Sequence, residues 1–151
     1  MNVHFLNGPN RPLSTLVVDD NHEWRRLVAE NVELHLGSRP LVAANGQVAL
    51  EIMAECPIDL VLSDLFMPGM DGFQFLQQAQ ELFPRTKVIL LSADFGAFPV
   101  PPQQLIDRGA LAAISKAEIA STLANVLRFM QEDFHRKVME MNASLQPSAN
   151  A

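Results

Sequence analysis

Several features that would assign a class at once are scarce or absent in this 151-residue chain. A single cysteine, Cys56, excludes an internal disulfide and a zinc site built from cysteines alone. The formal net charge of −6 lacks the basic excess of a general nucleic-acid binder. No apolar run approaches the roughly 20 residues that span a bilayer, and the first residues lack the cationic start and apolar centre of a secretory signal. We therefore expect a cytoplasmic protein that binds neither nucleic acid nor membrane.

Short apolar runs alternate along the chain with segments of helical periodicity. The runs predict five strands, over residues 16–18, 40–44, 58–65, 87–93 and 111–115. The segments between them predict helices over 22–36, 47–56, 71–83 and from about 103, and a long helix follows the fifth strand. Strands separated by single helices need crossover connections, so the sequence predicts a doubly wound α/β domain with a parallel sheet.

Local signals set the expected ends of these elements. Gly37 is a predicted C-cap, Asp71 is a predicted N-cap, and the pair at 45–46 (Asn-Gly) is a predicted turn. The prolines at 99, 101 and 102 prevent a helix from starting before about Gln103. Trp24, near the start of the first helix, is expected to face the core.

The last predicted helix, from about Glu118 to Leu145, carries apolar residues every three or four positions. We predict a flexible leader over 1–13, a domain over 14–128, an extension of the last helix over 129–145 and a disordered tail over 146–151. Apolar residues of the extension, from Met130 onward, would be exposed in a monomer, which favours a homodimer or docking to a partner. Folding back onto the domain and fraying are the alternatives.

Polar side chains stand where the predicted strands end. Asp19 and Asp20 follow the first strand, Asp64 ends the third, Ser92 ends the fourth and Lys116 follows the fifth. Ligands of parallel α/β sheets collect at the carboxyl ends of the strands, so we expect these side chains to converge. Three carboxylates offer the hard oxygen ligands that suit Mg²⁺, and a divalent ion would relieve their mutual repulsion. An alternative is that these are unrelated surface residues, such as carboxylates that cap helices. That alternative could account for any one of the five residues, but not for all five at strand ends.

Such a site suits transfer of a phosphoryl group to a carboxylate. The metal ion and Lys116 would neutralise charge on the phosphoryl oxygens, and Ser92 could donate a hydrogen bond to one of them. Aspartate is a competent acceptor, as enzymes with an aspartyl-phosphate intermediate demonstrate.

Over about Ser14 to Arg128, the chain resembles a receiver domain of the two-component response regulators. The matching segments follow the family's order: LVVDD, VAANGQVALE, VLSDLFMPGMDG, VILLSA and GALAAISK. The resemblance implies a flavodoxin-like sheet of five parallel strands in the order 2-1-3-4-5, flanked by five helices, the last of them extended. It also implies a phosphoprotein that signals through changed protein–protein contacts and is not an enzyme.

The resemblance assigns roles to the acidic residues. Asp64 would accept the phosphoryl group from a phosphohistidine on a histidine kinase or phosphotransfer protein. Asp20, Asp64 and the backbone carbonyl of Phe66 would ligate Mg²⁺, and Asp19 would hold a metal-bound water. A downstream protein partner would then recognise the phosphorylated form.

The resemblance also assigns roles around the phosphoryl group. Ser92 would follow that group as the switch hydroxyl, and Lys116 would pair with one of its oxygens. Phe66 and Asp94, each two positions beyond a site residue, would flank the group. There the Phe66 ring could shield the acyl phosphate from water, and the Asp94 carboxylate could discourage or orient an attacking water.

Two positions depart from the family pattern. Ala113 stands three residues before the lysine, where the family usually carries an aromatic ring that changes rotamer on activation. Ala117 follows the lysine in place of the usual proline, so we expect a trans peptide there. The usual relay from hydroxyl to aromatic ring therefore lacks its ring, and we expect output to pass through the proline-containing segment and the last helix.

Two other functions fit part of the pattern. A phosphorylation-independent interaction or dimerisation module could use the same scaffold. A Mg²⁺-dependent phosphohydrolase also uses an aspartate at a strand end, but it needs a second acid two residues later and a cap insertion. Phe66 occupies that position and the chain has no room for a cap, so we rank the phosphohydrolase lowest.

Overall fold

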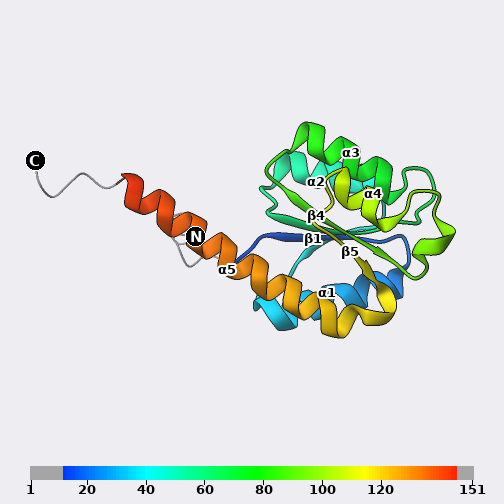
Figure 1. The fold of residues 1–151 in the computed structure, drawn as a ribbon, viewed down its shortest axis with the longest axis horizontal. Coiled ribbons are helices and arrows are strands. Elements are labelled where there is room, and N and C mark those ends of the chain that lie inside the picture. Colours follow the sequence, from blue (N-terminus) through cyan, green and yellow to red (C-terminus); the bar gives the residue numbers. More distant parts are fainter. Residues whose placement is uncertain (1–11, 146–151) are drawn as a thin grey trace, which may run out of the picture.

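The computed structural model describes residues 12–145 of the protein, and these residues fold around one parallel sheet (Figure 1). Its strands are β1 (Thr15–Val18), β2 (Leu41–Ala43), β3 (Leu60–Asp64), β4 (Lys87–Ser92) and β5 (Ala112–Ser115). They are all parallel and lie in the order β2-β1-β3-β4-β5. The predicted doubly wound sheet of order 2-1-3-4-5 is therefore confirmed.

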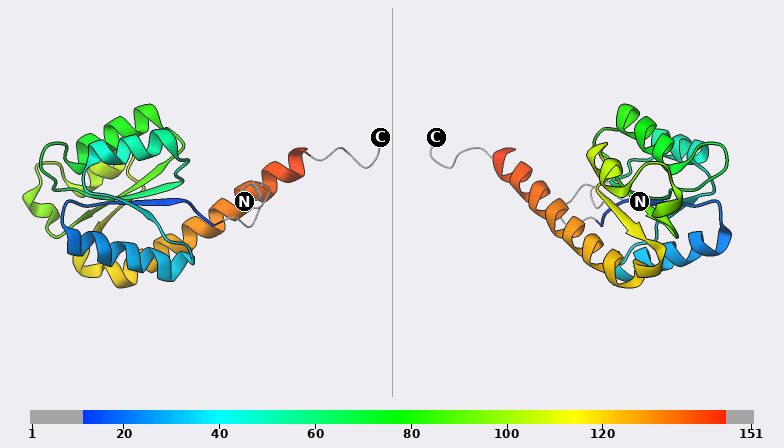
Figure 2. Two further views of the ribbon diagram at one scale, coloured as in Figure 1. Left: turned by 180° about the vertical axis from the view of Figure 1, so that it is seen from behind. Right: turned by 45° about the vertical axis from the view of Figure 1, so that its right-hand side comes forward.

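Five α-helices cover the two faces of the sheet. They are α1 (His22–Leu36), α2 (Gly46–Glu55), α3 (Gly72–Leu82), α4 (Pro102–Asp107) and α5 (Ile119–Leu145), with short 3₁₀ turns at Phe95–Ala97 and Lys116–Glu118. Helices α2, α3 and α4 lie on one face, and α1 and α5 lie on the other (Figures 1 and 2). This arrangement makes three layers, with the sheet in the middle.

Each face of the sheet has its own hydrophobic core. Successive residues of a strand point to opposite faces, so Leu16 and Val18 join the core under α2 and α3, whereas Val17 joins the core over α1 and α5. β1 and β3, which lie inside the sheet, are buried along their whole length. Their continuous apolar runs follow from burial on both faces.

Local residue chemistry explains where the helices begin and end. Gly37 ends α1 in the left-handed conformation, with a φ of 72°, and Asp71 caps α3 with a complete capping box, as predicted. The pair at 45–46 is not the predicted turn. Asn45 is instead the N-cap of α2, because its side chain accepts a hydrogen bond from the Val48 amide.

Helix α4 starts at Pro102, one residue before the earliest predicted start. Proline fits the first turn of a helix because the amide that it lacks would have had no partner inside the helix. The peptide between Lys116 and Ala117 is trans, as predicted, since residues 12–145 contain no cis peptide.

Helix α5 is 27 residues long and runs from the carboxyl edge of the sheet past its other edge (Figures 1 and 2). Ile119, Leu123 and Leu127 are buried, as expected for its first half. The predicted exposure of the extension from Met130 onward is too broad, because Met130 is buried and Phe134 packs against the core of α1 and α5. The exposed large apolar residues of the extension are Phe129, Met139, Met141 and Leu145.

The domain begins slightly earlier than the predicted boundary at residue 14. Leu13, which the sequence assigned to a leader over 1–13, is buried in the core that α1 and α5 cover. The rest of that leader up to residue 11, and the predicted tail over 146–151, lie outside the described residues. Within the described part of the chain, no helix has the length and apolar character to cross a membrane.

Candidate functional site

The predicted site residues meet at the carboxyl edge of the sheet. Asp19 directly follows β1, Asp64 is the last residue of β3, Ser92 is the last residue of β4, and Lys116 directly follows β5. The register places Asp64 opposite Leu91, one residue before Ser92. The crossover topology therefore places polar residues from four neighbouring strands along one edge.

Three carboxylates form an acidic cluster at this edge. One oxygen each from Asp19, Asp20 and Asp64 lies within 4.8 Å of the other two. Asp19 and Asp64 are buried, whereas Asp20 is exposed. Burial and the negative charge of Asp19 raise the pKa of Asp64, and Lys116 lowers it, with a net result of about 6. The cluster thus holds more negative charge than its surroundings stabilise.

Lys116 bridges the two buried acids. Its Nζ atom lies 2.8 Å from Oδ2 of Asp19 and 3.2 Å from Oδ1 of Asp64. The lysine is only 6% exposed, so both ion pairs are shielded from solvent. Lys116 pairs with Asp19 and Asp64, so the nearby carboxylate of Asp20 adds negative charge that a further cation would offset.

Three hydrogen bonds hold Asp19 in place, one to its carboxylate and two to its backbone. Its carboxylate accepts a hydrogen bond from the amide of Asn21 at 2.9 Å, and its carbonyl accepts one from Nη1 of Arg25 at 2.8 Å. Its own amide donates to the carbonyl of Ala43 at the end of β2. These contacts fix the acid between β1 and α1, and the sequence analysis did not identify the role of Arg25.

The loop after β3 passes very close to Asp64. A Cβ atom at Gly72 would lie 2.3 Å from the Asp64 carbonyl oxygen, so only glycine fits at that position. Gly69 has a φ of 77°, which also favours glycine. The two glycines of the PGMDG segment therefore let the chain turn sharply beside the acidic cluster.

Ser92 is fully buried at the end of β4, and its hydroxyl accepts a hydrogen bond from the Asp94 amide at 3.1 Å. Asp94 is exposed, and its side chain caps the short 3₁₀ turn by accepting a hydrogen bond from the amide of Gly96. The two residues predicted to surround the phosphoryl group on this side thus belong to one compact turn.

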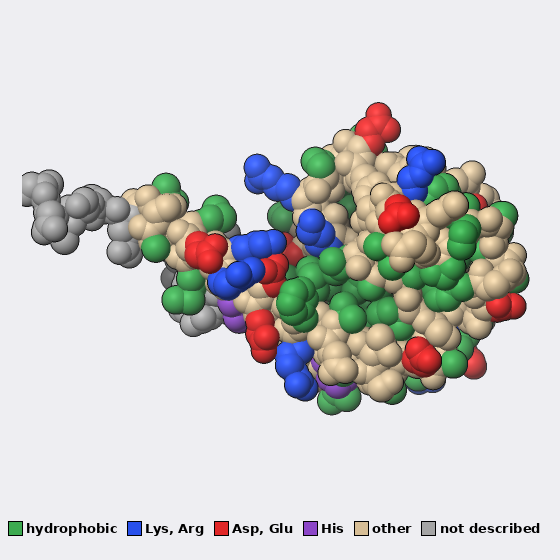
Figure 3. Space-filling view, viewed as in Figure 1, with side chains coloured by type: hydrophobic (Ala, Val, Ile, Leu, Met, Phe, Trp, Pro, Cys, Tyr) green, Lys and Arg blue, Asp and Glu red, His purple; other side chains and the backbone are tan. Residues whose placement is uncertain are grey.

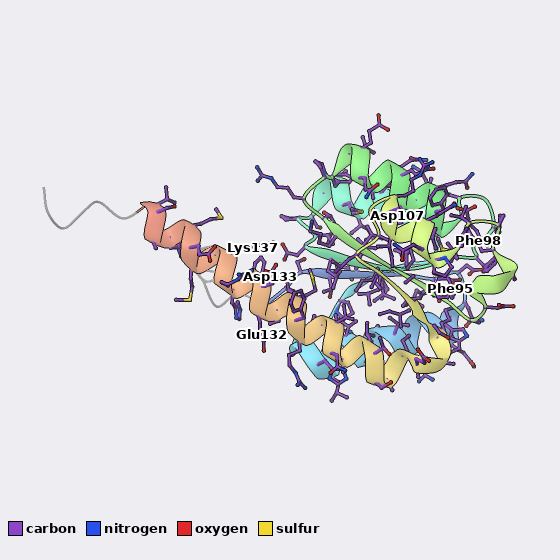
Figure 4. The ribbon with its side chains drawn as sticks, viewed as in Figure 1. Phe95, Phe98, Asp107, Glu132, Asp133 and Lys137 are labelled. Atoms are coloured by element: carbon purple, nitrogen blue, oxygen red, sulfur yellow. The ribbon has the colours of Figure 1, made fainter. Side chains whose placement is uncertain are left out.

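Phe66 makes a contact that the sequence analysis missed. The side chain is 43% exposed, and its ring meets the ring of Phe98 edge to face, with centroids 5.2 Å apart. Phe98 belongs to the segment between β4 and α4, where Figure 4 labels it beside Phe95. The loop that follows Asp64 is therefore in direct contact with the proline-containing segment.

Trp24 does not face the core as predicted. Neither of the two cores formed by the described residues includes it, and its ring lies beside Lys116, with Nζ 4.8 Å from the ring centroid. The distance in sequence between Trp24 and Asp20 could have indicated its place near the site. A residue four positions after Asp20 lies in the first turn of α1, next to the carboxyl edge of the sheet.

The donor atoms present suit magnesium. Carboxylate oxygens are the hard ligands that Mg²⁺ prefers, and the raised pKa of Asp64 reflects burial and unbalanced negative charge that a divalent cation would offset. The residues that would hold the ion are Asp19, Asp20 and Asp64, whose carboxylates this structure brings together.

The fold and this edge define a doubly wound α/β domain with an acidic site at the carboxyl ends of its strands. Residues 15–128 match the family described as the response regulator receiver domain. The chain belongs to this family and is a receiver domain of two-component systems.

Similar proteins include parts of large sensor kinases. The chain is 32% identical over 123 residues to the sensor histidine kinase RcsC of Salmonella typhimurium. The matched region covers 82% of this chain and 13% of that protein. It is 38% identical over 87 residues to the autoinducer 1 sensor kinase/phosphatase LuxN of Vibrio campbellii, covering 58% of this chain and 10% of that protein. The chain thus spans only about a tenth of these relatives.

Solved structures share the whole domain. The signal receiver domain of an HD domain-containing protein from Pseudomonas fluorescens has a TM-score of 0.70 at 26% identity, covering 83% of this chain and 99% of that chain. The chemotaxis protein CheY4 of Vibrio cholerae has a TM-score of 0.69 at 26% identity, covering 79% of this chain and 98% of that one.

Proposed function

We propose that this receiver takes a phosphoryl group onto Asp64 from a phosphohistidine on a histidine kinase or phosphotransfer protein, and that Mg²⁺ is required. The observation that carries the proposal is the acidic cluster of Asp19, Asp20 and Asp64, bridged by the ammonium of Lys116. The sensor kinases among the relatives support a kinase as the donor.

The transfer needs an ionised acceptor. One oxygen of Asp64 attacks phosphorus, a P–O bond forms, and the P–N bond to the donor imidazole breaks with its electron pair staying on nitrogen. Lys116 compensates negative charge on the phosphoryl oxygens, and Ser92 donates a hydrogen bond to one of them. Asp20, Asp64 and the backbone carbonyl of Phe66 would hold Mg²⁺, with Asp19 acting through a bound water, and the ion would supply further charge compensation.

The surroundings of Asp64 tune the lifetime of the acyl phosphate. The exposed ring of Phe66 shields the phosphoryl group from water, and the carboxylate of Asp94 acts on an approaching water from the other side. In this scheme the acyl phosphate itself is the signal, so the protein acts as a phosphorylated signalling protein and not as an enzyme.

Output passes by protein–protein contact. The usual aromatic ring is missing at Ala113, whereas the contact between Phe66 and Phe98 links the phosphorylated loop to the segment before α4. That segment and α5 therefore carry the change to a downstream protein. The exposed Met139, Met141 and Leu145 of α5 provide a surface for such a partner or for a second copy of the chain.

Fluorescence of Trp24 tests the proposal. Acetyl phosphate or beryllofluoride, added with Mg²⁺, should change the emission of this single tryptophan, because its ring lies beside Lys116. Asp64→Asn should remove the change, since the amide cannot accept a phosphoryl group. Each addition is repeated without Mg²⁺ as the control.

The other functions give different results in the same assay. Steady release of phosphate from small phosphate esters would favour the phosphohydrolase. An unchanged emission in every condition, without phosphorylation of Asp64 by mass spectrometry, would favour an interaction module that works without phosphorylation.

A further inference from the structure

Trp24 is held in a defined position above the acidic cluster. It lies in the first turn of α1, where its amide donates a hydrogen bond to Oδ1 of Asn21, the N-cap of the helix, at 2.9 Å. The same Asn21 donates its own amide to the Asp19 carboxylate. The start of α1 therefore ties the tryptophan backbone to the acid that binds Lys116.

The indole ring of Trp24 completes the surroundings of the Lys116 ammonium. Nζ lies 4.8 Å from the ring centroid, 2.8 Å from Asp19 and 3.2 Å from Asp64. A cation within about 6 Å of an aromatic face is attracted by the ring quadrupole, and tryptophan gives the strongest attraction of the aromatic side chains. The attraction grows when the pair is desolvated, and this lysine is only 6% exposed.

Core packing does not explain the ring. Neither core of the described residues includes Trp24, although large aromatic side chains usually contribute most of their free energy through burial. Lysine carries a flexible stem of four carbons, so its charge can reach more than one place. A ring beside the ammonium limits those places to the region between Asp19 and Asp64.

We propose that Trp24 is a positioning residue that holds the ammonium of Lys116 where it can meet the phosphoryl oxygens on Asp64. The inference rests on the proposed function, since it concerns the rate at which Asp64 accepts the phosphoryl group. Trp24 does not touch the reacting atoms in this scheme, and it acts only through the lysine.

Two substitutions separate this role from simple packing. With acetyl phosphate and Mg²⁺, Trp24→Leu should slow the initial phosphorylation of Asp64 by about 5- to 30-fold, because leucine fills space but attracts no cation. Trp24→Phe keeps an aromatic face and should restore the rate to within about 3-fold of the unsubstituted protein. Equal rates for the leucine variant and the unsubstituted protein, or no rescue by phenylalanine, would overturn the inference.

A spectroscopic measurement reports on the contact without any phosphorylation. Lys116→Met removes the charge beside the indole, so the emission maximum or intensity of Trp24 should change, whereas Lys87→Met, at the opposite end of the sheet, should leave both unchanged. An emission that Lys116→Met does not alter would overturn the inference, even if either tryptophan variant fails to fold.

The design keeps the two proposals apart. If the unsubstituted protein becomes phosphorylated and Asp64→Asn does not, the proposed function stands whatever the tryptophan variants do. If the unsubstituted protein takes no phosphoryl group, the proposed function fails, and the emission of Lys116→Met still decides whether Trp24 senses the ammonium.

Discussion

The carboxyl group of Asp64 combines burial with charges of both signs. Its pKa is raised from the 3.8 of an unperturbed aspartate to about 6, because burial and the charge of Asp19, which raise it, outweigh Lys116, which lowers it. Between about pH 4 and 6 the folded state therefore binds more protons than the unfolded state, and the free energy of unfolding decreases as the pH rises through that window. At neutral pH the ionised Asp64 destabilises the metal-free protein.

Asp64→Asn should consequently stabilise the metal-free protein at pH 7, by on the order of 1–2 kcal/mol after allowance for solvent screening. The gain should disappear below about pH 4, where Asp64 is protonated in both the folded and the unfolded state. Urea unfolding at pH 4 and pH 7 measures both values. Asp107→Asn, at an exposed position on α4, is the matched control and should change stability by less than about 0.5 kcal/mol.

An equal stabilisation by Asp64→Asn at the two pH values would contradict the electrostatic explanation. A second arm adds Mg²⁺ at pH 7, which should raise the melting temperature of the unsubstituted protein, because a ligand that binds only the folded state stabilises it. Asp64→Asn, which removes one carboxylate from the cluster, should show a smaller increase.

Residue identity predicted the acidic cluster well but missed the aromatic contacts beside it. Asp19, Asp64 and Lys116 stand at the carboxyl ends of strands of one parallel sheet, and the crossover topology alone brings such positions to one edge. The positions of Trp24 and Phe98 depend on side-chain rotamers and on the path of irregular segments, which no periodicity in the sequence encodes. Because tryptophan is largely apolar, the sequence favoured a core location for Trp24, which the structure does not show.

At the scale of elements, the segment between β4 and α4 lies in contact with the loop after Asp64. It contains the short 3₁₀ turn at Phe95–Ala97 and the prolines 99 and 101, and its Phe98 contacts Phe66 in the loop after β3. Aromatic pairs of this geometry contribute about 0.5–1.5 kcal/mol beyond their buried area. This contact gives a structural change at Asp64 a route to the segment before α4 that needs no aromatic ring at position 113.

Phe98→Ala should uncouple this segment from the site. When beryllofluoride and Mg²⁺ are added, amide NMR shift changes at residues 95–98 and at Val100 should fall by about half or more, because the ring that meets Phe66 is lost. Ala113→Tyr is the control and should leave both phosphorylation and these shift changes intact. Loss of phosphorylation in the Ala113→Tyr variant, or unchanged shifts in Phe98→Ala, would argue for a different route.

Most element boundaries were predictable because short-range chemistry decides them. Gly37 and Asp71 end and begin helices through backbone conformation and side-chain capping that depend on nearby residues alone. Asn45 was ambiguous, because asparagine followed by glycine favours a turn and also suits an N-cap. In the structure the Asn45 side chain accepts a hydrogen bond from the Val48 amide and so begins the helix, which the sequence of the pair alone does not decide.

On the scale of the whole molecule, the acidic site and the end of α5 lie at opposite ends (Figure 1). Lys116 starts the 3₁₀ turn that leads directly into α5, so one continuous backbone joins the site to the extension. Figure 3 shows hydrophobic side chains gathered between α4 and α5, and the exposed apolar residues of this part of the chain include Ile106 and Leu111. The face between the two helices thus offers a second apolar surface along the same path.

The extension of α5 has features of a helix that is stable in water. Asp133 forms ion pairs with Arg136 and Lys137 along one side (Figure 4), and such pairs support helices by a few tenths of a kcal/mol each. Its exposed apolar residues need another explanation, because Met141 is 63% and Leu145 is 77% exposed. With Phe134 and Val138 they are spaced by four, three and four residues, which is the spacing of a coiled-coil seam.

We therefore expect the protein to self-associate through this seam, with Met141→Glu shifting the population from dimer to monomer in sedimentation-velocity experiments. A buried glutamate in such a seam lacks a partner, whereas in the monomer it is solvated, so the stability of the domain should change by less than about 0.5 kcal/mol. Ala143→Glu adds the same charge on the opposite side of the helix and should leave association unchanged. If both variants and the unsubstituted chain are monomers, the expectation of self-association through this seam is wrong.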